Sequence, residues 1–345
     1  MADPSLILVG PVVSEDHAHR GHPERPGRLR AVNDGVAALH LGEDLVVLES
    51  RAATPAQLEL VHSEAYLERL RGFCRDGGGS LDPDTYATTA SWDAARLAAG
   101  AGLVAVDALR SASSGVAFVA ARPPGHHALA DRSMGFCLLN NVAVTAASLV
   151  AGGERVLIVD WDVHHGNGTE NLFWEEPRVL YVSTHQWPCY PGTGRVTDVG
   201  GPAAPGTTVN VPLPPGSTGE AVRLAFDVMI EPAVAAFRPT WVLVSAGFDA
   251  HRADPLADLA LSDGDFAELA RRVASYAPGP GRMVLFLEGG YDLEALRTST
   301  SAAIGALVGA PAPSDPLTSG GPDSAHVHRL EDERRAALDA LGAAG

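Results

Sequence analysis

The stretch "VLIVDWDVHHGNG", residues 156–168, decides the fold because it joins a continuous apolar run to a dense group of polar side chains. Val156–Val159 are all apolar rather than alternating, which is typical of a strand buried on both faces of a parallel sheet. Four ionisable residues follow at once: Asp160, Asp162, His164 and His165. Buried acids and imidazoles are costly unless they are paired or bound to a metal ion. The stretch therefore predicts either a metal site or an ion-paired loop at the end of a strand.

Similar apolar runs recur along the chain, namely Val46–Leu48, Val116–Ala120, Val179–Val182, Trp241–Ser245 and Met283–Leu287. Helical patterns lie between them, at Ser91–Arg110, Asn141–Val150, Gly219–Phe237, Asp263–Tyr276 and Leu293–Val308. This alternation predicts an α/β doubly wound fold. Gly200–Pro215 is rich in glycine and proline and predicts an irregular connection. No boundary divides the chain, so we expect one domain over residues 1–345, with a surface linker at 311–328 and a short charged helix near Leu330–Leu341.

Composition limits the partners of this chain of 345 residues. It carries 25 basic and 42 acidic residues, a formal net charge of −17, and no basic stripe, so we expect no nucleic-acid partner. No apolar run is long enough for a membrane span, so we expect no membrane partner either. The three cysteines, Cys74, Cys137 and Cys189, form no disulfide or metal spacing and predict free thiols in a cytoplasmic protein. The sequence leaves open whether the chain forms a homo-oligomer.

Three further apolar runs end in polar motifs. Val116–Ala120 leads to "RPPGHHA", Trp241–Ser245 leads to "AGFDAHRADP", and Met283–Leu287 leads to "EGGYDL". Ligands of open parallel sheets bind outside the carboxyl ends of the strands, so these motifs should converge with the first one on a single crevice. The ionisable residues they bring are His126, His127, Asp249 and Tyr291.

The chemistry of these residues indicates a catalytic site. In an extended chain Asp160, Asp162 and His164 share one face, and Asp249 can add a carboxylate from a second strand. Three oxygen or nitrogen ligands with one open position are typical of catalytic zinc, although an ion-paired loop without metal is the alternative. Paired histidines suit proton transfer, and a phenol after two glycines can donate to an oxyanion. The alternative for the paired histidines is that they are ordinary surface residues, and the alternative for the Gly-Gly-Tyr motif is a plain turn.

Taken together, the motifs resemble the zinc-dependent histone deacetylase and acetylpolyamine amidohydrolase family, in its class II-like bacterial form. The resemblance rests on "RPPGHHA", "GFCLLNNVA", "VDWDVHHGNG", "VLYVSTH", "VSAGFDAHRADPL" and "LEGGYDL", in the family's order, from about His22 to beyond Tyr291. It implies the arginase–deacetylase α/β fold, with a largely parallel eight-stranded sheet flanked by helices.

The resemblance also implies metal sites. Asp162, His164 and Asp249 match the ligands of one catalytic Zn²⁺. Asp160 matches an aspartate that pairs with the first histidine and helps to bind a structural K⁺. Ser183 and the backbone of Asp162, His164 and Thr184 would complete the potassium shell. Whether Fe²⁺ or another metal replaces zinc in the cell is left open.

Catalytic and substrate-binding roles follow from the same resemblance. His127 matches the general base, Asn167 the residue that orients it, and Tyr291 the oxyanion donor, while His126 is the partner of Asp160. His165 matches no ligand and is predicted to be structural. Residues that match the wall of a narrow tunnel for an acyl-lysine stem are Gly135, Phe136, Tyr190 and Leu256.

We therefore expect a zinc-dependent amidohydrolase that removes an acetyl or other acyl group from a lysine-type amine. Acetylated polyamines and small acylated metabolites are the alternative substrates. The apolar Leu256 favours acyl-lysine, whereas Asp82 or Asp84 could supply the charge that a polyamine requires. Both lie in the segment 77–91, which we call the rim and whose role the sequence leaves open. An inactive acyl-lysine-binding protein is less favoured because none of the catalytic residues is missing. An arginase-like dinuclear enzyme would need further aspartates.

Overall fold

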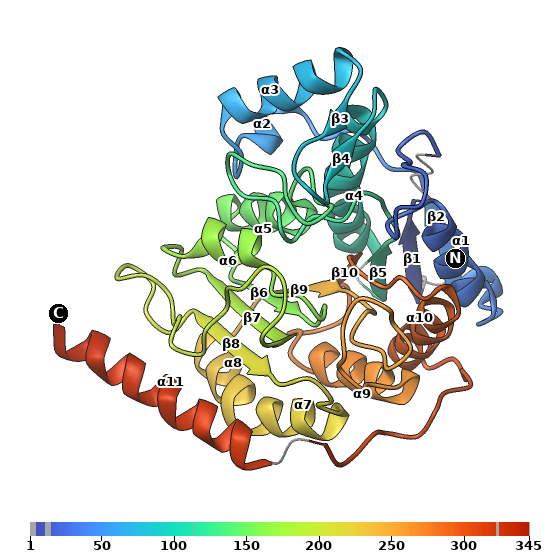
Figure 1. The fold of residues 1–345 in the computed structure, drawn as a ribbon. Coiled ribbons are helices and arrows are strands. Elements are labelled where there is room, and N and C mark those ends of the chain that lie inside the picture. Colours follow the sequence, from blue (N-terminus) through green and yellow to red (C-terminus); the bar gives the residue numbers. More distant parts are fainter. Residues whose placement is uncertain (1–4, 11–14, 113, 322–323, 345) are drawn as a thin grey trace.

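The structure, a computed structural model, describes residues 5–10, 15–112, 114–321 and 324–344 (Figure 1). Its centre is an eight-stranded sheet with the order β2-β1-β5-β10-β9-β6-β7-β8, and all neighbouring strands in this sheet are parallel. The parallel α/β fold expected from the sequence is therefore confirmed. The strands are β1 (Leu6–Val9), β2 (Leu45–Leu48), β5 (Val116–Val119), β6 (Val156–Asp160), β7 (Val179–Gln186), β8 (Thr208–Leu213), β9 (Trp241–Ala246) and β10 (Met283–Leu287).

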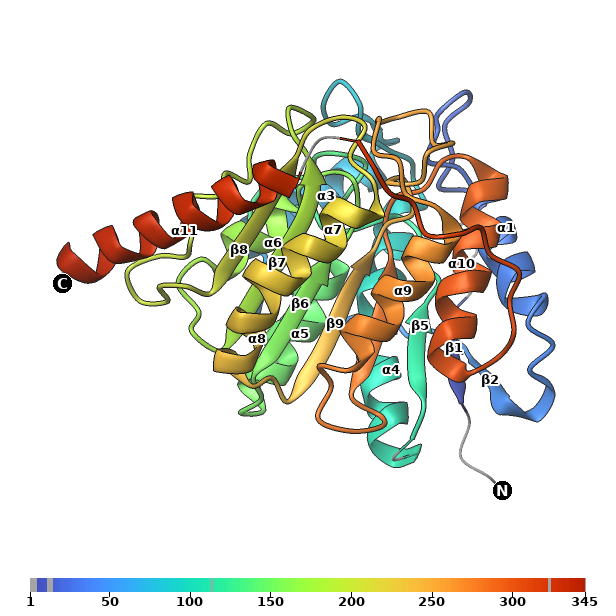
Figure 2. The same cartoon turned by 90° about the horizontal axis from the view of Figure 1, so that it is seen from below.

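Helices cover both faces of this sheet (Figure 2). The described α-helices are α1 (Gly27–Ala37), α2 (Pro55–Leu58), α3 (Glu64–Arg75), α4 (Ser91–Ala112), α5 (Asn141–Ala151), α6 (Asn167–Phe173), α7 (Gly219–Ala225), α8 (Glu231–Phe237), α9 (Asp263–Ala274), α10 (Leu293–Val308) and α11 (Ser324–Ala344). A π-helical turn, Phe226–Ile230, joins α7 to α8. One hydrophobic core lies under α1 and α7–α10, and the other lies under α3, α4 and α5. The apolar runs are buried on both sides for this reason.

Polar residues begin the helices that follow the site loops. Asn140 accepts a hydrogen bond from the Ala143 backbone at the start of α5, and Asp292 accepts one from Ala295 at the start of α10. Such caps satisfy backbone N–H groups that have no partner within the helix. The loops before α5 and α10 are thus held at the carboxyl edge of the sheet.

Two predictions about the later chain were wrong. Gly200–Pro215 is not wholly irregular, because β8 lies within it and pairs with β7. Val209, Val211 and Leu213 of this strand point into the core, and Pro212 is tolerated because β8 is an edge strand.

The predicted linker at 311–328 is also too long at its carboxyl end. Residues 310–321 are irregular, but α11 already begins at Ser324 and continues to Ala344, so it is longer than the short helix expected near Leu330–Leu341. Val327 and Leu330 are buried in the core, and this contact lengthens the helix at its start.

The first part of α11 lies beside the edge strand β8, while its carboxyl end projects from the body (Figure 1). Arg334 donates to the carbonyl oxygen of Thr208 at 2.5 Å and to that of Gly206 at 3.1 Å. His326 contacts the Pro212 carbonyl oxygen at 3.0 Å. Neither α11 nor any other helix in the described part of the chain has the length and apolar character needed to cross a membrane.

Candidate active site

A pocket of about 170 Å³ lies at the carboxyl ends of the four strands whose motifs were singled out. These strands are adjacent in the sheet, in the order β5-β10-β9-β6, so their following loops meet at one place. The pocket is lined by Asp84, Pro124, His126, His127, Gly135, Phe136, His164, Tyr190, Leu256, Gly289 and Tyr291.

Asp162, His164 and Asp249 form a cluster that can hold a metal ion, since one possible ligand atom of each lies within 4.8 Å of the others. His164 Nδ1 is 3.1 Å from Asp162 Oδ1 and 3.2 Å from Asp249 Oδ2. Both carboxylates are buried. Asp249 Oδ2 receives no hydrogen bond of acceptable geometry from any described residue, which leaves it available as a ligand.

The pKa values of this cluster reflect two carboxylates crowded into a buried space. Burial, followed by the charge of Asp162, raises the pKa of Asp249 to about 7. Burial acts to lower the pKa of His164, but the neighbouring carboxylates of Asp162 and Asp249 raise it well above its ordinary value. The cluster therefore attracts positive charge, which a divalent cation would supply.

Backbone groups fix the two carboxylates. The N–H of Gly289 donates to Asp162 Oδ2 at 2.7 Å, and the N–H of Val163 donates to Asp249 Oδ1 at 2.9 Å. A Cβ atom on Gly289 would lie 2.0 Å from Asp249 Oδ2, and one on Gly247 would lie 2.1 Å from Asp162 Oδ2. Only glycine lets the backbone come this close to the cluster.

The tandem histidines have different partners and opposite charge preferences. His126 Nδ1 lies 3.0 Å from Asp160 Oδ2, whereas His127 Nδ1 lies 2.8 Å from Asn167 Oδ1. Burial acts to lower the pKa of His126, but Asp160 and Asp162 raise it to about 10. Burial and the charge of His126 lower the pKa of His127 well below its ordinary value. His126 is therefore held as a cation, and His127 is neutral and can accept a proton.

The side chain of Tyr291 lines the pocket and packs against Arg28, a buried arginine to which the sequence analysis gave no role. The guanidinium of Arg28 lies 4.8 Å from the centre of the Tyr291 ring, and its Nε donates to the Gly290 carbonyl at 2.6 Å. Arg28 also donates to the Glu288 carbonyl and pairs with Glu24 at 3.3 Å. Burial raises the pKa of Tyr291 well above its ordinary value, so the phenol stays protonated and can donate a hydrogen bond.

Glu288 is a second buried residue to which the sequence assigned no role. Its carboxylate accepts from the N–H of Gly125 at 2.7 Å and of His126 at 3.2 Å, and from the Ser245 hydroxyl at 3.2 Å. It thereby ties β10 and β9 to the loop of the tandem histidines. An acid at the end of an otherwise apolar run was the one signal that could have identified it.

The predicted tunnel residues do meet in the pocket. A Cβ atom on Gly135 would lie 2.4 Å from the His127 ring and 3.0 Å from Tyr190, so glycine keeps this wall open. The ring centres of Tyr190 and His127 are 5.2 Å apart, and those of Phe136 and Tyr291 are 5.8 Å apart. Leu256 lies in the lining and is 37% exposed.

Asp84 is the acidic member of the same lining. It belongs to the rim, between the two strands of the small antiparallel hairpin β3 (Gly79–Ser80) and β4 (Tyr86–Ala87). Asp82 is not in the lining, but its carboxylate accepts from the backbone of Asp84 at 3.0 Å.

The residues matched to a potassium site lie side by side on β6 and β7. Asp160 is in register with Ser183, and Thr184 follows on β7. The Ser183 hydroxyl contacts His185 Nδ1 at 2.9 Å, and the Tyr181 hydroxyl lies 3.3 Å from Asp160. All of these side chains are buried.

His165 lies outside the metal cluster. Its Nδ1 is 2.8 Å from the Thr193 hydroxyl, and its Nε2 is 3.1 Å from Glu170. Both ring nitrogens are used in these contacts, which matches the structural role expected of it.

Comparison with known proteins identifies the class of protein that carries this fold and pocket. Residues 22–307 match the family model described as the histone deacetylase domain. Histone deacetylase 10, chloroplastic, of Oryza sativa subsp. japonica is 43% identical over 319 residues, covering 86% of this chain and 71% of that protein. The histone deacetylase-like amidohydrolase of Pseudomonas aeruginosa is 38% identical over 280 residues, covering 80% and 74%. The crystal structure of the HDA15 HD domain matches with a TM-score of 0.89 and 33% identity, covering 99% of this chain and 97% of that one.

The chain belongs to the histone deacetylase and acetylpolyamine amidohydrolase family. Its fold is correspondingly the arginase–deacetylase fold expected from the sequence. Membership supports a hydrolase with deacetylase or amidohydrolase activity.

Proposed function

We propose that the chain is a zinc-dependent amidohydrolase that removes an acetyl group from a lysine-type amine. One observation carries this proposal: a candidate metal triad reaches a single pocket through its histidine, and the same pocket is lined by two residues that can donate or accept a proton. The triad is Asp162, His164 and Asp249, and the other two residues are His127 and Tyr291.

The triad suits Zn²⁺, which prefers oxygen and nitrogen ligands and keeps one position open in catalytic sites. Asp249 Oδ2 accepts no hydrogen bond of acceptable geometry from a described residue, and this atom and the crowding of two buried carboxylates support a bound cation. When bound, the metal would polarise the amide carbonyl and lower the pKa of water.

His127 acts in this proposal as the general base and then as the general acid. Its Nδ1–H donates to Asn167 Oδ1, which leaves Nε2 as the acceptor. It takes one proton from the attacking water and delivers one to the amine as the C–N bond breaks, so acetate and free amine result. His126, held as a cation by Asp160, favours the negative charge that develops next to it.

Tyr291 donates its phenolic hydrogen to the carbonyl oxygen as this oxygen becomes negative. Arg28 positions the ring and the Gly289–Gly290 backbone, so it acts through Tyr291 rather than on the substrate.

We also propose a structural K⁺ held by Asp160, Ser183 and the backbone of Asp162, His164 and Thr184. The adjacency of Asp160 and Ser183 on β6 and β7 supports this proposal. A cytoplasmic location is proposed as well, supported by three free cysteines, of which Cys74 and Cys137 are buried.

Acyl-lysine is the substrate class that the apolar Leu256 at the tunnel mouth favours. Acetylated polyamines are a second candidate because Asp84 in the pocket lining can bind a second ammonium group. Both stems are aliphatic, so the tunnel alone does not separate them.

An activity panel tests the proposal. The purified chain, with its zinc content measured, is assayed on an acetyl-lysine peptide, N8-acetylspermidine and a small acetylated amine. We expect turnover that is lost on chelation and restored by Zn²⁺. Saturable binding of the peptide without turnover by the zinc-loaded protein would instead identify an inactive acyl-lysine-binding protein.

A further inference from the structure

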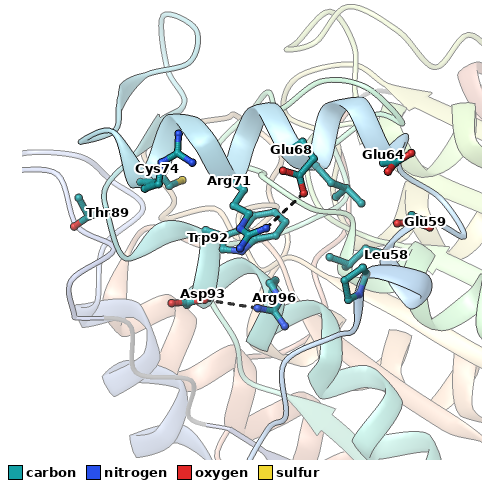
Figure 3. Close-up of a pocket in the computed structure, with 13 residues that line it drawn as sticks. Leu58, Glu59, Glu64, Glu68, Arg71, Cys74, Thr89, Trp92, Asp93 and Arg96 are labelled. Carbon is teal, nitrogen blue, oxygen red and sulfur yellow. Dashed lines mark ion pairs between the residues drawn. The ribbon is translucent and has the colours of Figure 1, made fainter.

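Helix α3 at the rim has a cavity on each of its two sides. The larger cavity, about 650 Å³, lies between α2, α3 and the start of α4 (Figure 3). The smaller one, about 280 Å³, lies between α3, the rim hairpin and the segment 131–133. Both cavities are lined by arginines, but the two sets of arginines differ in whether a carboxylate pairs with them.

Each arginine of the larger cavity already has a carboxylate partner. Arg71 pairs with Glu68 at 3.6 Å and Arg96 pairs with Asp93 at 3.8 Å, as the dashed lines in Figure 3 indicate. Arg75 pairs with Asp76 at 2.9 Å. This cavity therefore offers no uncompensated cation to a ligand.

The smaller cavity differs because its arginines have no ion-pair partner among the described residues. Arg69 donates only to the backbone carbonyl of Asp131, at 2.9 Å, and lies 5.8 Å from the centre of the Tyr66 ring. The Arg132 side chain forms no hydrogen bond or ion pair with the residues that the structure describes. Asp131 is also in the lining, but its carboxylate lies beyond ion-pair distance of both. In a chain with a net charge of −17, two uncompensated cations in one cavity are a specific feature.

The floor of this cavity is formed by buried and largely apolar side chains. Leu70 and Tyr66 are buried, and the Tyr66 hydroxyl contacts the Ser133 hydroxyl and the Leu138 carbonyl, each at 2.5 Å. Phe73 and Leu81 complete the lining. Such a floor accepts the methylene groups of a side chain whose charged end meets the two guanidinium groups.

Two chain segments contribute to both the smaller cavity and the tunnel. Segment 131–133 leads directly into the tunnel residues Gly135 and Phe136, and Leu81 is on the hairpin that carries Asp84. Burial raises the pKa of Tyr190 in the tunnel wall, Asp84 raises it further and Arg132 lowers it, so both charges reach the tunnel wall. The rim is therefore negative at Asp84 and positive at Arg69 and Arg132.

We propose that the smaller cavity binds an acidic side chain of an acyl-lysine peptide while the acyl-lysine occupies the tunnel. This inference rests on the proposed function and refines its substrate class to acyl-lysine with a nearby glutamate or aspartate. Arginine pairs with carboxylate through two parallel hydrogen bonds, which the planar guanidinium groups permit. Because both arginines are exposed, we expect about a three- to fivefold effect on kcat/KM.

Matched peptides test the proposal. Each carries one acetyl-lysine and differs only in having Glu, Gln or Lys at one neighbouring position, which is varied in turn on both sides. At one or more positions on one side of the acetyl-lysine, we expect kcat/KM to be highest with Glu, lower with Gln and lowest with Lys. The differences should arise from KM rather than from kcat. Added salt should weaken this order because salt screens exposed charges.

Arg132→Gln and Arg69→Gln should each reduce the differences in kcat/KM among the Glu, Gln and Lys peptides. Neither variant should change kcat on a neutral acetylated amine. Arg71→Gln is the matched control, since Arg71 lies on the other side of α3 and is paired with Glu68, so the order should persist.

The outcomes separate this inference from the proposed function. Turnover of all peptides with equal kcat/KM at every position would overturn the cavity assignment and leave the deacetylase proposal intact. A glutamate preference that survives both variants, or that is equally lost in Arg71→Gln, would also overturn it. Absence of turnover on every peptide would overturn the proposed function and this inference together.

Discussion

At the carboxyl edge of the sheet, Asp160, Asp249 and Glu288 are fully buried, and each accepts a hydrogen bond from a backbone N–H. At the rim, Arg132 and Leu256 are exposed. The buried groups cannot reorient without leaving polar atoms unpaired, whereas the rim groups can move or change at small cost. We therefore assign chemistry to the buried edge and substrate choice to the rim. The following substitutions test this division, from the largest expected effect to the smallest.

Removing a ligand should have the largest effect. Asp249→Ala should nearly abolish activity and weaken zinc retention, because two protein ligands remain and the outgoing carboxylate has no substitute. Zinc content after dialysis and turnover are the measurements. Asp107→Ala is the control, since Asp107 is exposed on α4. Stoichiometric zinc with normal turnover in Asp249→Ala would refute the ligand assignment.

Removing a single hydroxyl from the buried edge comes next. Tyr291→Phe keeps the ring under Arg28 and should lower kcat by about 10²–10³, which is typical of losing one oxyanion donor. Tyr276→Phe, at a partly buried tyrosine that follows α9 and does not line the pocket, should have no such effect. A Tyr291→Phe enzyme within about a factor of two of wild type would mean that Tyr291 only packs.

A change of charge beside the base should move the pH profile rather than the maximum rate. The pKa of His127 is lowered by burial and by His126, so the base stays neutral well into the acid range. Asn167→Asp adds a carboxylate next to Nδ1 and should raise that pKa, so the acid limb of kcat/KM should move to higher pH by about one unit or more. Asn171→Asp, on the exposed face of the same helix, is the control. Superimposable acid limbs for wild type and Asn167→Asp would exclude this contact.

The smallest effect is expected at the rim. Leu256→Glu should shift the ratio of kcat/KM for N8-acetylspermidine to that for an acetyl-lysine peptide upward by about three- to tenfold, since the added carboxylate is exposed. Leu317→Glu, at an exposed position outside the pocket, should leave the ratio unchanged. A clear preference of the wild-type enzyme for the polyamine would contradict the role given to Leu256 and point to Asp84.

The same division separates what the sequence predicted from what it did not. The buried edge was predictable because its residues follow apolar runs directly, as Asp162 and His164 follow β6, and because local motifs carry the family resemblance. Arg28 was not predictable in this way. Its role depends on contacts with Gly290 and Tyr291, which only the folded chain brings close to it.

The rim and the sheet edge were less predictable for related reasons. β8 contains Pro212 and follows a glycine-rich segment, so the local sequence favours a strand only weakly, and pairing with β7 decides the structure. Arg69 and Arg132 lie in different elements and show no shared pattern in the sequence. Their proximity depends on how α3 packs over the segment that precedes the tunnel wall.

The contact between α11 and β8 has a consequence for self-association. An edge strand presents unpaired backbone groups to which a strand from another molecule can add. Here Arg334 occupies the Thr208 carbonyl, and His326 contacts that of Pro212, so the helix shields this edge. Loss of α11 would leave the chemistry of the pocket in place and yet expose a template for aggregation. We therefore expect this charged helix to hinder edge-to-edge association between copies of the chain.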